Sequence, residues 1–182
     1  IKQEEFSFLF YSQSASVPFN VLFFHATGFN AQTYNILFKS LMNKFDGEMN
    51  ILALDQRGHG KSTAESNSQE LKSWYVYLED ALAFSNQISG PIVCIGHSMG
   101  AIVAARLVEL RQNKDDSLVM IEPVLAGPYE SLKYRIFSKL HIKRKISIAE
   151  DAAKRRSTFK SAKEAINSYV GRGAFSSWGR QW

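Results

Sequence analysis

Residues 91–110 read Pro-Ile-Val-Cys-Ile-Gly-His-Ser-Met-Gly-Ala-Ile-Val-Ala-Ala-Arg-Leu-Val-Glu-Leu, and this stretch decides the fold class. An apolar run follows Pro91 and has the length of a buried strand. From Ser98 onward the apolar residues recur instead at helical spacing. Between the two lies Gly-His-Ser-Met-Gly over residues 96–100, a G-x-S-x-G at a sharp strand-to-helix turn. Such a turn strains the serine backbone and brings the residues two before and two after it so close that both must be glycine.

This turn would lift the Ser98 hydroxyl above the edge of the sheet, with the N-terminus of the next helix behind it. Free N–H groups and the positive end of a helix stabilise a developing oxyanion. The pattern therefore predicts that Ser98 is a nucleophile. The alternative is a glycine-flanked turn that contains an incidental serine, and the strand before and the helix after the motif argue against it.

The bulk composition is that of a soluble globular protein, and the length is that of one domain that can carry a subdomain. Of its 182 residues, 45% are hydrophobic and 21% are charged. The single cysteine, Cys94, lies in the apolar run, so no intrachain disulfide framework is possible and a reducing cytoplasm is predicted. No stretch has the length of a membrane span. The chain begins with Ile1 instead of Met, and we expect a fragment on that ground.

Apolar strand patterns alternate with helical patterns through the first two thirds of the chain. Strands are predicted over 4–12, 21–24, 50–54, 92–95 and 118–121, and helices over 33–45, 70–87 and 98–110. This alternation predicts an α/β fold in which a mostly parallel sheet is covered by helices on both faces. Residues 1–127 are taken as this core.

The chain changes in character after Pro128. Residues 129–172 contain 12 Lys and Arg against 4 Asp and Glu, with helical patterns over 132–140 and 149–170 and no convincing strand. Such charge could bind nucleic acid or an acidic membrane surface. The basic residues are spread among apolar residues at helical spacing, however, as on a solvated helical face. We therefore predict a solvated helical region over 128–182, with no nucleic-acid partner.

Three loops that follow predicted strands share one resemblance. His-Ala-Thr-Gly-Phe-Asn over 25–30, Asp-Gln-Arg-Gly-His-Gly-Lys-Ser over 55–62 and the G-x-S-x-G resemble, in order and spacing, the loops of the α/β-hydrolase superfamily. The resemblance is to serine-nucleophile members of the esterase and lipase type. It implies a catalytic core over about 4–127 and an incomplete helical cap, or lid, over 128–182.

The resemblance also implies the site residues. Ser98 matches the nucleophile, and the backbone N–H of Met99 matches one donor of the oxyanion hole. Thr27 matches the second donor, although the preceding position holds Ala26 where the superfamily has glycine. In the superfamily, further positions hold the loops in place by hydrogen bonds, and they are matched here by His25, Arg57, His59 and His97. None of these four is expected to be the catalytic base.

The acid and the base of the triad are expected after the nucleophile, in the order Ser, Asp or Glu, His. Glu122 follows the next predicted strand and is a possible triad acid. His141 is the one histidine after Ser98, but it lies in a basic segment without a nearby carboxylate and is not expected to be the base. We therefore expect the catalytic histidine to lie beyond Trp182 and the chain alone to be inactive. The acid is left open between Glu122 and a residue beyond Trp182.

The predicted function is that of a serine hydrolase that acts by acyl transfer on a small ester-like carbonyl substrate, with no metal or organic cofactor. Esterases, lipases, thioesterases, peptidases and carbon–carbon bond hydrolases all remain open. The alternative is a non-catalytic binding protein that keeps the fold without the triad. The oligomeric state does not follow from the sequence.

Overall fold

The computed structural model describes residues 4–14, 16–66, 74–125, 127, 158–172 and 176. The chain divides into two compact units, Ile1–Val124 and Leu125–Trp182, and each is described here by itself.

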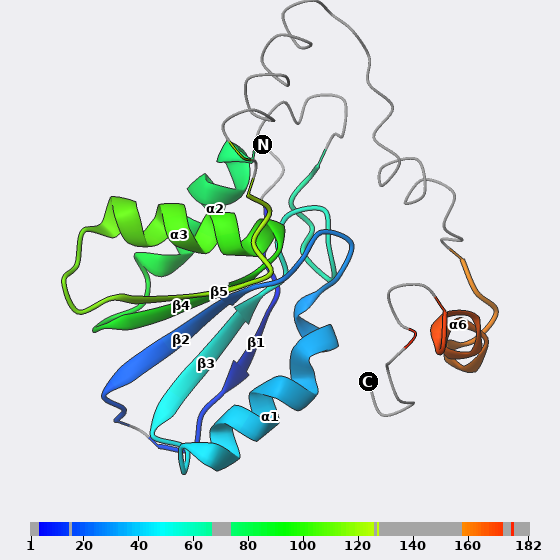
Figure 1. Ribbon diagram of the computed structural model, residues 1–182, viewed down its shortest axis with the longest axis horizontal. Coiled ribbons are helices and arrows are strands. Elements are labelled where there is room, and N and C mark those ends of the chain that lie inside the picture. The colour runs from blue at the N-terminus through cyan, green and yellow to red at the C-terminus, as the bar shows by residue number, and fades with distance from the viewer. Residues whose placement is uncertain are drawn as a thin grey trace, which may run out of the picture. The chain divides into compact units, whose positions relative to one another are not determined.

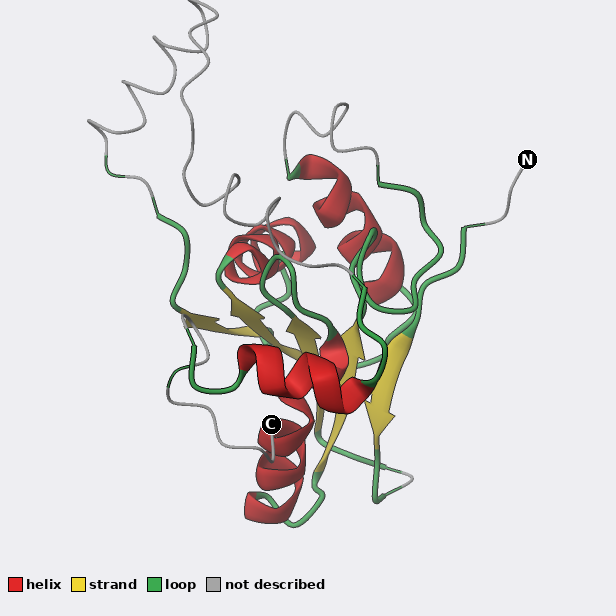
Figure 2. Ribbon diagram, turned by 90° about the vertical axis from the view of Figure 1, so that its right-hand side faces the viewer, coloured by secondary structure: helices red, strands yellow, loops and turns green. Residues whose placement is uncertain are grey.

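The first unit is built on a five-stranded sheet with the order β1-β3-β2-β4-β5 (Figure 1). The strands are β1 (Phe8–Tyr11), β2 (Phe19–Phe24), β3 (Met49–Leu54), β4 (Ile92–His97) and β5 (Ser117–Ile121). Every neighbouring pair is parallel except β1 and β3, which are antiparallel. Figure 2 shows the strand arrows turning from one edge of the sheet to the other, as the right-handed twist of strands requires. The predicted fold class is confirmed.

Helices cover both faces of this sheet (Figure 1). The 3-10 helix η1 (Ala31–Tyr34) and α1 (Asn35–Lys44) lie on one face, and α2 (Tyr75–Ser85) and α3 (Met99–Arg111) lie on the other. The central strand β2 serves both layers, because alternate side chains of a strand point to opposite faces. Leu22 and Phe24 pack with α2 and α3, whereas Val21 and Phe23 pack with η1 and α1.

Two predicted elements differ from those observed. The helix expected over 33–45 is two elements, because Asn30 caps a separate 3-10 turn by accepting a hydrogen bond from the Thr33 N–H at 3.1 Å. The strand expected over 4–12 is shorter, since ladder pairing with β3 begins at Phe8. The helix expected over 70–87 is described from Tyr75 onward as α2, and residues 67–73 lie outside the described residues.

The second unit contributes one described helix, α6 (Ala162–Tyr169), which lies within the predicted helical pattern over 149–170. It begins after Ser161, whose hydroxyl accepts a hydrogen bond from the Glu164 N–H at 3.2 Å. The rings of Phe159 and Tyr169 pack edge to face, with centroids 5.8 Å apart. The helix expected over 132–140 lies outside the described residues. Over the described ranges, no helix combines the length and the apolar character needed to cross a membrane.

Candidate active site

Ser98 occupies the turn between β4 and α3, as the sequence predicts. Its backbone has φ 55° and ψ −116°, a left-handed region that residues other than glycine rarely adopt. The Ser98 N–H donates a hydrogen bond of 2.9 Å to the carbonyl of Ile121, so the end of β5 holds the turn in place. The predicted strain at this serine is confirmed.

The two flanking glycines are required by close backbone contacts. A Cβ atom at Gly96 would lie 2.2 Å from the carbonyl oxygen of Gly100. A Cβ atom at Gly100 would lie 2.3 Å from the carbonyl oxygen of Phe24 and 2.6 Å from that of His25. The first turn of α3 therefore lies directly against the end of β2, where the loop containing Thr27 begins.

Residues 25–28 form a short loop after β2 that side chains from other elements hold in place. The Ala26 N–H donates to the hydroxyl of Tyr34 at 3.1 Å, and the Gly28 N–H donates to Nε2 of His59 at 3.1 Å. The carbonyl of Ala26 accepts a hydrogen bond of 2.8 Å from Nδ1 of His25. The backbone on both sides of Thr27 is thus fixed by hydrogen bonds.

Thr27 itself lies beside the start of α3. Its hydroxyl donates to Sδ of Met99 at 3.4 Å, so the side chains of the two residues with the predicted oxyanion donors are in contact although 72 residues separate them. Across the part of the chain that the structure describes, neither the Thr27 N–H nor the Met99 N–H has a hydrogen-bond acceptor. One of these two amides directly follows Ser98 at the N-terminus of α3, and the other belongs to Thr27, whose side chain contacts Met99.

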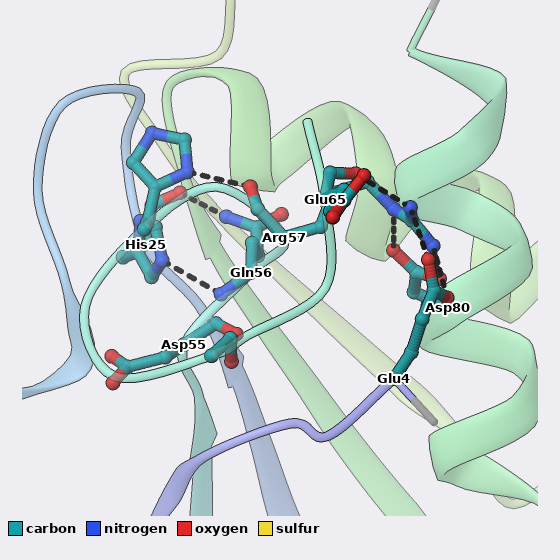
Figure 3. A network of polar contacts seen from close by, with 9 residues as sticks. Glu4, His25, Asp55, Gln56, Arg57, Glu65 and Asp80 are labelled. Atoms are coloured by element: carbon teal, nitrogen blue, oxygen red, sulfur yellow. Dashed lines mark hydrogen bonds and ion pairs between the residues drawn. The ribbon is translucent and has the colours of Figure 1, made fainter. Parts of the chain in front are cut away.

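His25 braces two loops from a fully buried position. Its Nε2 accepts a hydrogen bond of 3.0 Å from the Gln56 N–H, and the Gln56 side-chain amide donates to the His25 carbonyl at 2.8 Å (Figure 3). Burial lowers the pKa of His25 to about 4, so the ring is neutral at physiological pH. The predicted bracing interaction of His25 is present.

Arg57 and Asp55 hold the second loop to its surroundings. The guanidinium of Arg57 makes two hydrogen bonds to Asp80, of 2.6 and 2.7 Å, and also contacts Glu4 (Figure 3). These carboxylates raise the pKa of Arg57 further above its ordinary value. The Asp55 carboxylate accepts the N–H of Ala31 at 2.8 Å and also that of Lys61, so it ties the loop to η1.

His59 and His97 also hold loops by hydrogen bonds. Nδ1 of His59 bonds the Arg57 carbonyl at 2.9 Å, so its Nε2 is free to accept the Gly28 N–H. Nδ1 of His97 lies 2.7 Å from the Tyr34 hydroxyl. Among the described histidines, none is hydrogen-bonded to the Ser98 hydroxyl. His141 lies outside the described residues.

Glu122 follows β5 directly, at the same sheet edge as Ser98. Its backbone has φ 44°, and its side chain is 87% exposed. The carboxylate lies 3.8 Å from Nε2 of His97. The structure thus brings Glu122 to the neighbourhood of Ser98 and shows His97 as its nearest described partner.

Sequence reasoning missed two residues of this network, Tyr34 and Gln56. Tyr34 appeared in the sequence as one apolar position of a predicted helix, and nothing in its spacing marked the hydroxyl as functional. Gln56 lies in the loop over residues 55–62, and its place in that loop is the one feature of the sequence that could have marked it as part of the network. Over the described residues, no group of three or more His, Cys, Asp or Glu side chains could hold a metal ion.

Comparison with known proteins identifies the family. The model of the family described as serine aminopeptidase, S33, matches residues 17–177. A lipase, LipV, of Mycobacterium tuberculosis is 34% identical over 85 residues, which cover 43% of this chain and 29% of that protein. The human monoglyceride lipase is 25% identical over 141 residues, which cover 74% of this chain and 45% of that lipase. The chain thus spans less than half the length of these relatives.

Solved structures share the fold. The thioesterase domain from the curacin biosynthetic pathway superposes with a TM-score of 0.68 at 19% identity, over 99% of this chain and 65% of that domain. A monoacylglycerol lipase of Paleococcus ferrophilus superposes with a TM-score of 0.51 at 21% identity, over 75% of this chain and 52% of that lipase. The match of the family model over most of the chain, together with this fold, confirms the resemblance seen in the sequence. The chain belongs to the serine aminopeptidase S33 family of α/β hydrolases.

Proposed function

We propose that the protein is a serine hydrolase that cleaves a small ester-like substrate by acyl transfer, with Ser98 as the nucleophile. The observation that carries this proposal is the pairing of a strained serine with two unpaired amides. Ser98 has φ 55° at a strand-to-helix turn. The amide of Met99, which follows it, and that of Thr27, whose hydroxyl contacts the Met99 side chain, lack acceptors among the described residues. Strain of this kind costs roughly 1–3 kcal/mol and persists where function requires it.

The chemistry proceeds in two displacements. A base removes the Ser98 proton while Oγ bonds the substrate carbonyl carbon, and the carbonyl electron pair moves onto oxygen. The Thr27 and Met99 amides would donate to this oxyanion. When the tetrahedral intermediate collapses, the bond to the leaving oxygen breaks and the base returns the proton to the alcohol. Water then attacks the acyl-enzyme by the same route and releases the carboxylic acid.

The base is a histidine outside the described residues in this proposal. His25 and His59 use both ring nitrogens in holding loops, and Nδ1 of His97 bonds Tyr34. None of the three is therefore free to accept the Ser98 proton and be oriented by an acid. Glu122 is the candidate acid, because it lies at the same sheet edge and its carboxylate is exposed.

Residues 128–182 are proposed to form part of a helical cap that shapes the substrate pocket. The described helix α6 has Ala165, Ile166 and Tyr169 at helical spacing, as an amphipathic cap helix requires. Relatives include two lipases and protein phosphatase methylesterase 1 of Schizosaccharomyces pombe, which is 24% identical over 151 residues. These names support an ester as the substrate class. No metal or organic cofactor is needed for the proposed steps, and we propose a cytoplasmic location.

The test is covalent labelling combined with turnover. The complete product of the gene is incubated with a fluorophosphonate and digested, and mass spectrometry locates the adduct. Hydrolysis of p-nitrophenyl acetate is then measured for Ser98→Ala and for Ser89→Ala, which removes an exposed serine hydroxyl. We expect the adduct on Ser98, at least a 10³-fold loss of kcat in Ser98→Ala, and no change in Ser89→Ala. Full activity in Ser98→Ala would refute Ser98 as the nucleophile, whereas an unchanged protein with neither an adduct nor turnover above background would favour the non-catalytic binding protein.

The 182-residue chain by itself is expected to show little Ser98-dependent turnover, because none of its described histidines can act as the base. Loss of one triad member typically leaves only about 10³–10⁴-fold catalysis over water. Rapid Ser98-dependent turnover by this chain would make His141 the base to test.

A further inference from the structure

The hydroxyl of Tyr34 lies between the loop over residues 25–28, which contains Thr27, and the end of β4, which leads into Ser98. It bonds the Ala26 N–H at 3.1 Å and Nδ1 of His97 at 2.7 Å. Ala26 directly precedes Thr27, and His97 directly precedes Ser98. The Tyr34 oxygen thus bonds both the residue before the predicted oxyanion donor Thr27 and the residue before the proposed nucleophile Ser98.

The direction of these hydrogen bonds follows from the groups involved. A backbone N–H can only donate, so the Tyr34 oxygen accepts from Ala26. Burial raises the pKa of Tyr34 to about 12, so the hydroxyl keeps its proton at neutral pH. In the described part of the chain, Nδ1 of His97 is the only acceptor that this proton reaches. His97 then carries its own proton on Nε2, on the side of the Glu122 carboxylate 3.8 Å away.

The ring of Tyr34 is fixed by aromatic packing. It lies against Phe23, with centroids 4.5 Å apart, and its centroid is 6.1 Å from that of Phe29. The edge of the ring meets His97 at a centroid separation of 5.9 Å. The side chain is only 9% exposed. A ring held this firmly gives its hydroxyl a defined position, which is what a group that orients others requires.

We propose that Tyr34 is a positioning residue for the oxyanion hole: its hydroxyl holds the loop of Thr27 in a fixed place relative to Ser98. The proposal rests on the proposed function and deepens it. An oxyanion donor helps only when it lies within hydrogen-bond distance of the developing charge. Without the Tyr34 hydroxyl, the Ala26 N–H would be buried and unpaired, and the loop would move to satisfy it.

The test compares two tyrosines that each lose only a hydroxyl. Tyr34→Phe keeps the packed ring and removes both hydrogen bonds. Tyr11→Phe is the matched control. Over the described part of the chain, the Tyr11 hydroxyl bonds Asn35 alone, at 2.5 Å, and the Tyr11 ring packs on the same face of the sheet. The complete gene product carries each substitution, and kcat and KM for p-nitrophenyl acetate are measured together with the thermal midpoint of unfolding.

We expect Tyr34→Phe to lower kcat by about 10- to 100-fold, less than the 10²- to 10³-fold typical of deleting a donor. KM should change by less than about threefold, since the donor acts in the transition state. Tyr11→Phe should stay within about twofold of the unchanged protein in both constants. A Tyr34→Phe protein with the kcat of the control, at whatever thermal midpoint, would overturn the proposal.

A spectroscopic measurement tests the same contact without turnover. Nitrogen-15 spectra of the histidines should show His97 protonated on Nε2 and unprotonated on Nδ1, and this preference should weaken in Tyr34→Phe and persist in Tyr11→Phe. A proton on Nδ1 of His97 at neutral pH would refute the arrangement. Ser98→Ala distinguishes a failure of the proposed function from a failure of the proposed role of Tyr34. If it keeps full turnover, the proposed function fails and the role of Tyr34 with it, whereas an inactive Ser98→Ala beside a fully active Tyr34→Phe refutes the role of Tyr34 alone.

Discussion

Replacing Gly100 by alanine tests whether the elbow is as tightly packed as the structure indicates. Gly100 is the second residue of α3, where helix propensity alone predicts that alanine stabilises by up to about 1 kcal/mol. The new methyl group, however, would lie 2.3 Å from the Phe24 carbonyl oxygen and 2.6 Å from that of His25. Both atoms belong to the backbone and cannot rotate away. Helix propensity therefore predicts that Gly100→Ala raises the free energy of unfolding, whereas the close contacts predict that it lowers it.

The magnitude follows from the distance to be gained. An ordinary carbon–oxygen contact needs roughly 1 Å more than the 2.3 Å available, so α3 and the end of β2 must separate by about that amount. Overpacking of this kind costs about 1–3 kcal/mol, and a net loss of about 2 kcal/mol corresponds to a fall of about 4–8 °C in Tm for a chain of this size. A displacement of about 1 Å at a catalytic group can also cost about 10²-fold in rate.

The assay is thermal unfolding of the complete gene product followed by circular dichroism, with p-nitrophenyl acetate turnover on the same samples. Gly127→Ala is the matched control, because a Cβ atom there would have no neighbour within 4 Å among the described residues. We expect Gly100→Ala to lower Tm and kcat, and Gly127→Ala to change neither. A Gly100→Ala protein that is more stable than the unchanged protein would refute the close contact and leave helix propensity as the dominant effect.

Three further changes test the strain, the buried histidine and the arginine clamp. Because glycine adopts left-handed φ without strain, Ser98→Gly should be more stable than Ser98→Ala by about 1 kcal/mol in urea unfolding, and equal stabilities would contradict the strain. Burial lowers the pKa of His25 from 6.5 to about 4, so the unfolded chain binds a proton between these values that the folded protein does not. The free energy of unfolding should therefore be constant above pH 6.5 as far as His25 is concerned, and should fall by up to about 3 kcal/mol as the pH is lowered towards 4. His25→Gln should flatten this pH dependence. If the slope of unfolding free energy against pH is the same in His25→Gln, His25 is not its source. Arg57→Ala should lower the free energy of unfolding by about 3 kcal/mol, because it removes the arginine that pairs with the Asp80 carboxylate, whose side chain is only 10% exposed. Arg106→Ala, at an exposed ion pair, should cost less than about 1 kcal/mol, and similar losses in both variants would refute the clamp.

The elbow and the sheet could be predicted because their signals are local. A glycine at 96 and at 100 marks the close contact, and the change from a continuous apolar run to helical spacing marks the turn at Ser98. The neighbouring loops follow strands, and parallel strands bring their carboxyl ends to one edge. The approach of Thr27 to Met99 follows from that rule alone, and the structure has the two side chains in contact.

The hydrogen bonds that fix these loops could not be predicted in the same way. Tyr34 and His97 are 63 residues apart, and their contact depends on where η1 lies against the sheet. Asn30 ends the loop and begins η1 by a side-chain cap, a competition between local hydrogen bonds that periodicity does not reveal. Spacing places a residue on a face, whereas the direction of a hydroxyl depends on packing between elements far apart in the sequence.

The order of strands also affects how the chain folds during synthesis. β1 is made first, yet it pairs with β3 and not with β2, which follows it directly. At about 5–20 residues per second, the roughly 40 residues that separate the two strands take about 2–8 s to be made. We expect Phe8 and Phe10 of β1 to remain unpaired on the ribosome for that time, open to chaperones that bind exposed aromatic segments. β1 can therefore join the sheet only after β3 has been made, and a pause in translation before Leu54 would lengthen the time for which β1 stays unpaired.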